Sequence, residues 1–203
     1  EKSYESIVRG VVCIQTTYDP GYGSQYGLQV INCQNCDIQG FFTGVRHGVA
    51  IGGDDKIPSC PNRGLLVHDS ICKNTYNGES ACDMHGNTEN CIVNNVNCFV
   101  GGINLAGHNN KHRNINIYLG SSETDNTSYL AIQAREMKST QHEFSNINIV
   151  VPGVLTNPTR PLIDVGHNST PFNDTQTTIG GNLIFNNINI DAPLWDTAGT
   201  MHV

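Results

Sequence analysis

A short motif recurs six times along this chain and restricts the possible folds more than any other feature of the sequence. Each copy has Asn or Asp, then two residues, then Ile or Cys. The copies begin at Asn35, Asp69, Asn95, Asn114, Asn146 and Asn187. The intervals between successive copies differ widely, from the shortest between Asn95 and Asn114 to the longest between Asn146 and Asn187. A constant unit joined by segments of variable length is typical of a solenoid.

Within the copies, aliphatic and polar residues alternate with a period of two, as in Ile115-Asn116-Ile117. This alternation places the aliphatic side chains on one face of a strand. Ile and Val together far outnumber Leu and Ala together, so strand formers are plentiful and two of the strong helix formers are scarce. The sequence therefore predicts an all-β parallel β-helix, in which equivalent residues of neighbouring coils stack about 4.8 Å apart.

Stacking predicts that the six Asn and Asp positions form one column at a tight turn. In the inner ladder beside it, Cys72 and Cys98 take the place of Ile, so we expect these thiols to be buried and reduced. Cys33 and Cys36 have the CxxC spacing of a zinc or redox site, but no second pair follows at a matching spacing. We therefore expect cysteines in small apolar core positions, with no metal ion and no cofactor.

A second column, made of basic side chains, is expected on another strand of the coil. Its members are His47 (beside Arg46), His85, His108, Arg135 and His167, which recur at intervals comparable with those of the first column. Only 7% of the residues are aromatic, so the column predicts a hydrogen-bonding groove instead of an aromatic platform. The residues expected to bind a substrate there are Arg46, His47, His108, Arg135 and His167.

Two pairs of residues are candidates for catalysis. Asp83 and His85 lie two residues apart, so they share one face of a strand, and the carboxylate can orient the imidazole as a general base. The alternative is a pair that only stabilises the turn. Asp54 and Asp55 follow two glycines in a projecting loop, where they can polarise a water molecule or form a solvated acidic turn. Hydrolysis by two carboxyl groups and elimination by a base both remain open.

Length and charge exclude several classes of protein. The chain has 203 residues, which predicts one domain over residues 1–203. It begins with Glu1 and its recognisable coils cover about residues 27–191, so we expect a fragment of a longer chain. The formal net charge of -7 argues against a nucleic-acid partner. No run of 18 apolar residues is present, so membrane insertion by a helix is not expected.

Three features resemble one known superfamily: the Asn-x-x-Ile coils, Gly44-Val45-Arg46-His47-Gly48-Val49 and Ala81-Cys82-Asp83-Met84-His85-Gly86. They resemble the right-handed parallel β-helix of pectin-lyase-like proteins, and most closely the tailspikes of bacteriophages. The resemblance implies a homotrimer in the virion tail that binds, and in enzymatic members depolymerises, a bacterial surface polysaccharide. Two alternatives are a non-catalytic structural or adhesin solenoid and a secreted polysaccharide lyase or glycoside hydrolase.

Overall fold

The computed structural model of the chain describes residues 3–4, 7–14, 26–52, 61–74, 80–119, 131–137, 141–151, 162–165 and 183–191. Within these residues every regular element is a β-strand, and the strands pair in parallel to form three sheets. No helix in the described part of the chain is long and apolar enough to cross a membrane. The predicted all-β parallel β-helix is therefore confirmed.

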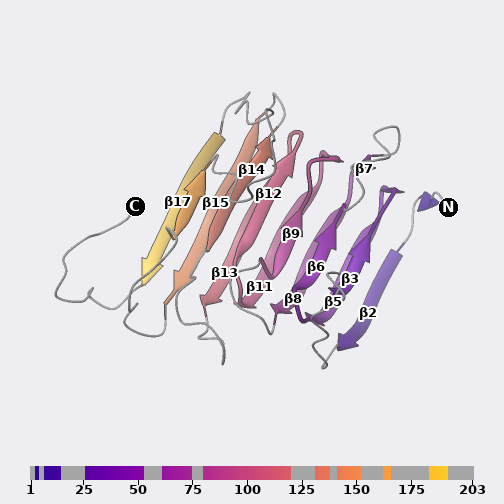
Figure 1. The fold of residues 1–203 in the computed structure, drawn as a ribbon, viewed down its shortest axis with the longest axis horizontal. Helices are drawn as coiled ribbons and strands as arrows, with labels where there is room; N and C mark the ends of the chain where they lie inside the picture. The colour runs from indigo at the N-terminus through magenta and orange to yellow at the C-terminus, as the bar shows by residue number, and fades with distance from the viewer. Residues whose placement is uncertain are drawn as a thin grey trace.

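The largest sheet has seven strands in the order β17-β15-β13-β11-β8-β5-β2. Its strands are β2 (Ile7–Ile14), β5 (Asp37–Gly44), β8 (Leu66–Asn74), β11 (Ile92–Val100), β13 (Lys111–Leu119), β15 (His142–Val150) and β17 (Leu183–Asp191). In Figure 1 these strands lie side by side in chain order, from β2 at one end of the molecule to β17 at the other.

The other two sheets complete each coil. The six-stranded sheet contains β3 (Tyr26–Val30), β6 (His47–Ile51), β9 (Cys82–Met84), β12 (Ile103–Gly107), β14 (Ile132–Met137) and β16 (Ile163–Val165). The four-stranded sheet contains β1 (Ser3–Tyr4), β4 (Cys33–Gln34), β7 (Asn62–Arg63) and β10 (Thr88–Glu89). Figure 1 shows the seven-stranded and six-stranded sheets facing each other across the interior.

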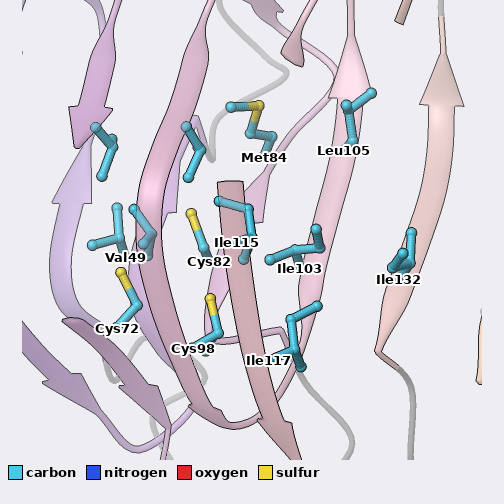
Figure 2. Packing of buried hydrophobic residues seen from close by; sticks show 14 of the residues in the cluster. Val49, Cys72, Cys82, Met84, Cys98, Ile103, Leu105, Ile115, Ile117 and Ile132 are labelled. Carbon is cyan, nitrogen blue, oxygen red and sulfur yellow. The ribbon is translucent and has the colours of Figure 1, made fainter. Parts of the chain in front are cut away.

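Apolar side chains fill the space between the sheets in ladders that run from coil to coil. Cys72 lies beside Cys98, which lies beside Ile117, and all three are fully buried. Both cysteines are free, as predicted, and Figure 2 shows them pointing into the same interior as Cys82 and Ile103. Burial raises the pKa of the Cys98 thiol, so the thiol stays protonated and behaves as a small apolar group.

Five of the six motif positions form the predicted column. The strand registers align Asp69, Asn95, Asn114, Asn146 and Asn187, and each has a positive φ between 45° and 55°. A left-handed residue inserted into a strand shifts the alternation by one position, so the strand can turn a corner while both halves face the core. Accordingly, Val93, Val96 and Cys98 are all buried around Asn95.

Asn35 does not belong to this column, so that part of the prediction is wrong. Gln34 pairs with Arg63, and Arg63 pairs with Glu89, which places Asn35 beside Gly64 and Asn90 at the corner after the four-stranded sheet. Asn35 has a φ of 51°, close to the values in the other column. The two corners look alike in sequence because both need a left-handed residue just before a strand enters the core.

Candidate functional site

The outer face of the six-stranded sheet carries a column of mostly polar residues. Asp83 lies between Cys82 and Met84, which both point into the core, so its own side chain faces away from the interior. The register places it between Ala50 on one coil and Asn104 on the next. Although it faces outward, Asp83 is only 1% exposed.

Among the described residues, the side chains of Asn104, His85 and His47 lie close to the carboxylate of Asp83. The amide of Asn104 donates a hydrogen bond to Oδ1 at 2.7 Å. Nε2 of His85 lies 2.8 Å from Oδ2, at ion-pair distance, although the two atoms are not aligned as a directed hydrogen bond. Nε2 of His47 lies 3.6 Å from the same oxygen. A buried carboxylate is costly unless such groups compensate its charge, so the arrangement holds Asp83 firmly in one place.

His85 and His47 differ in their access to solvent. The side chain of His85, one residue beyond β9, is 22% exposed, whereas that of His47 is 1% exposed. Nδ1 of His47 donates to the carbonyl oxygen of Ser80 at 2.6 Å, and its ring stacks on Tyr26 with a centroid separation of 5.3 Å. His47 was expected to bind substrate, but its buried ring packs beside Asp83 instead. His85 is the member of the cluster that can contact a ligand.

The five basic positions do not form one column, so this expectation is wrong. His47 pairs with Tyr26, whereas His108 pairs with Glu89 at a different corner of the coil. The reason is the length of the turn. Asp83 aligns with Asn104 and Glu89 aligns with His108, but more residues separate Asp83 from Glu89 than Asn104 from His108, so His85 has no counterpart at His108. Asp83, His85 and His108 also do not share one accessible face, since Asp83 is buried.

The remaining predicted residues are distributed as follows. Arg46 is partly buried in the turn between β5 and β6. Arg135 belongs to β14, where the register shifts, and its side chain lies outside the described part of the structure. Asp54, Asp55 and His167 also lie outside the described residues. The described residues contain no group of three or more His, Cys, Asp and Glu side chains arranged to hold a metal ion.

An open hollow of about 510 Å³ lies at the corner between the four-stranded and seven-stranded sheets. Its described lining comes from three successive coils and comprises Glu89, Asn90, His108, Asn109 and Gln141. His108 was expected among the ligand-binding residues; the other four were not. The signal for this corner in the sequence is a left-handed Asn, present at Asn35, Asn90 and Asn109, which looks the same as the Asn at the other corner.

The seven-stranded sheet carries two ionic clusters that sequence analysis also missed. His68 lies between Asp37, 2.6 Å from Nε2, and Asp69, 2.8 Å from Nδ1. The hydrogen bond with Asp69 raises the pKa of His68. On later coils, Arg113 forms a two-point pair with Glu143 and lowers the pKa of that carboxyl group. Both clusters join neighbouring coils.

Comparisons with known proteins give a family and a set of similar folds. Residues 12–163 match the family model described as Gp49, pectin lyase-like. No curated protein matches the sequence. The tailspike protein gp49 from Pseudomonas phage LKA1 has a TM-score of 0.70 and 23% identity, with 99% of this chain aligned to 32% of that chain.

Two further tailspikes have similar folds. For gp61 of Pseudomonas phage phi297 the TM-score is 0.60 and the identity 17%, over 98% of this chain and 38% of that one. The third is the gp54 tailspike of Acinetobacter baumannii bacteriophage AP22, solved in complex with A. baumannii capsular saccharide. Its TM-score is 0.55 and its identity 19%, over 93% of this chain and 34% of that one. The chain thus spans about a third of the length of each tailspike it matches.

Proposed function

Because this chain belongs to the Gp49 pectin lyase-like family, we propose that it is part of a phage tailspike that binds a bacterial surface polysaccharide and cleaves it by elimination. The observation that carries the catalytic part is the contact of 2.8 Å between the buried carboxylate of Asp83 and the imidazole of His85. The structure of the AP22 tailspike with a capsular saccharide supports a glycan as ligand. The same likenesses support a location in the virion tail.

The burial of Asp83 favours one chemistry over the other. A glycoside hydrolase of the common type needs two carboxyl groups that flank the scissile bond. At 1% exposure, Asp83 does not reach a sugar and is a positioning residue. The imidazole of His85, at 22% exposure, is the group that touches the substrate. A carboxylate beside an imidazole orients the ring and stabilises its protonated form, which suits the imidazole to proton abstraction.

In the proposed step, His85 removes the proton on the carbon next to the carboxylate of a uronate unit. Because Nε2 faces Asp83, this proton goes to Nδ1. The electron pair of the broken C–H bond forms a carbon–carbon double bond, and the glycosidic C–O bond on the adjacent carbon breaks. The leaving oxygen takes a proton from water and becomes a new chain end, while the negatively charged Asp83 stabilises the imidazolium formed on His85. The imidazolium then returns its proton to the solvent, which restores the base.

The test is an activity assay on a panel of purified bacterial capsular and O-specific polysaccharides. On a polymer that the wild-type protein cleaves, unsaturated uronate absorbance and reducing ends should rise together. His85→Ala and Asp83→Asn should each lower the rate about 100-fold or more, because they remove the base or its orientation. His68→Ala is the matched control: this imidazole also contacts carboxylates, but on another sheet, and its loss should leave the rate unchanged.

Three results would contradict parts of the proposal. Reducing ends without unsaturated product would replace elimination by hydrolysis. Binding without either signal would favour a non-catalytic adhesin, in which Asp83 and His85 only stabilise the turn. Full activity in folded His85→Ala and Asp83→Asn variants would remove this pair from catalysis and direct the search to Asp54 and Asp55.

A further inference from the structure

We propose that the hollow lined by Glu89, Asn90, His108, Asn109 and Gln141 binds a neutral, hydroxyl-bearing sugar unit. The inference rests on the proposed function for the class of ligand, a polysaccharide. It concerns a different place on the coil, since Asp83 lies in the six-stranded sheet and the hollow lies at the corner after β10.

The wall of the hollow is rigid, because a buried amide holds it from inside. Asn110 is 0% exposed. Its Nδ2 donates to the Oγ1 of Thr88 at 2.7 Å and to the carbonyl oxygen of Ala106 at 2.5 Å. Its Oδ1 accepts from the backbone nitrogen of Cys91 at 2.8 Å. These bonds tie two coils together directly beneath Asn90 and Asn109, so the side chains that line the hollow start from a fixed backbone.

The side chains around the hollow keep hydrogen-bonding groups that the described residues do not use. Asn109 donates from Nδ2 to the Oδ1 of Asn90 at 2.6 Å, which leaves the NH2 group of Asn90 as a donor. Arg63 binds Oε2 of Glu89 twice, so Oε1 remains as an acceptor. In the described part of the chain, the imidazole of His108 and the side-chain amide of Gln141 have no hydrogen-bond partner. Donors and acceptors therefore alternate across three coils.

This pattern selects the chemistry of the ligand. A sugar hydroxyl both donates and accepts, so neighbouring hydroxyls match an amide, a carboxylate oxygen and an imidazole in turn. Glu89 and Arg63 form an ion pair at 2.6 Å, so the cation nearest the hollow already has a carboxylate partner and does not favour a second carboxylate or a phosphate. The described lining contains no Phe, Tyr or Trp side chain on which a planar apolar ligand could stack. A neutral sugar unit fits these conditions better than an acidic one.

The test uses the side-chain amide signals of Asn90, Asn109 and Gln141 in NMR spectra of the nitrogen-15-labelled protein. The probes are glucose, galactose, mannose and N-acetylglucosamine, with galacturonic acid as the acidic comparison. We expect at least one neutral sugar to shift the three hollow signals in a saturable way, and galacturonic acid to shift them less. Asn146 and Asn187 are matched control amides, since both are exposed and left-handed but lie on another corner.

Two variants connect the shifts to the hollow. Gln141→Ala removes one exposed amide and should weaken the fitted affinity about fivefold, as expected for one net hydrogen bond. Asn90→Asp replaces a donor by a carboxylate and should abolish saturation while the protein stays folded. Equal shifts at Asn146, stronger shifts with galacturonic acid, or no shift with any neutral sugar would overturn the inference. Because no turnover is measured, these results are independent of whether His85 is catalytic.

Discussion

The imidazole of His112 is a polar ring in a largely apolar interior. It is fully buried, stacks on Phe144 at 5.6 Å and donates from Nε2 to the carbonyl oxygen of Asn104 at 3.2 Å. Burial lowers the pKa of His112 to about 4; nearby His142 acts in the same direction, while the bond to Asn104 and the charge of Asp83 oppose it. The native core therefore needs a neutral imidazole at this position.

This residue predicts acid sensitivity. The unfolded chain binds a proton at His112 near pH 6.5, but the folded protein does so only near pH 4. The contribution of neutral His112 to the free energy of unfolding is therefore fully present above pH 6.5. It falls by about 3 kcal/mol as the pH drops from 6.5 to 4. Urea unfolding at several pH values should show this loss in the wild-type protein. The His112→Phe variant, in which a phenyl ring extends the stack on Phe144, should lose less stability over the same fall in pH. Parallel pH profiles for the two proteins would contradict the assignment.

At the scale of the strand, the left-handed Asn residues combine two roles. Asn146 has a φ of 53°, donates to Asn114 at 2.9 Å and accepts from Asn187 at 2.9 Å. Asn148, two residues later, has ordinary backbone angles and accepts one amide hydrogen bond, from Asn189 at 2.8 Å. The first position sets the corner of the strand, and the second only links neighbouring coils.

Substitutions separate these roles. Asn146→Ala loses the ladder bonds and places an ordinary side chain in the left-handed region, so it should lower the free energy of unfolding by about 2 kcal/mol. Asn146→Gly loses the same bonds without the strain and should cost about 1 kcal/mol less than Asn146→Ala. Asn148→Ala controls for loss of one ladder bond. Equal losses in Asn146→Ala and Asn146→Gly, measured by urea unfolding, would show that backbone strain has no part in the effect.

The same elements show what a sequence can predict here. Alternation around Asn95 and Asn114 is local, so it correctly predicted the strands, the inner ladder and the buried thiols of Cys72 and Cys98. Which coil positions lie side by side depends on the length of each turn. That length differs between the coils of His85 and His108, so the prediction that the basic residues form one column is wrong. The burial of Asp83 depends on tertiary packing that no spacing encodes.

At the scale of the whole molecule, we propose that the complete protein is a homotrimer, as the resemblance of its sequence to phage tailspikes implies. A β-helix also presents strand edges that association can cover. Light scattering of the full-length protein should give three times the mass of its chain. A monomeric mass would favour the alternative of a secreted enzyme that acts alone.

Coils of very different length share one register in this molecule. The stretch of chain from Asn95 to Asn114 is less than half as long as the stretch from Asn146 to Asn187, yet each pair is aligned. Since each coil rests only on its neighbours, additional length can enter the connecting segments without disturbing the ladders. Evolution can then lengthen, shorten or exchange those segments while the interior is inherited unchanged. For the polysaccharide binding proposed above, such exchange would supply new recognition surfaces without a new fold.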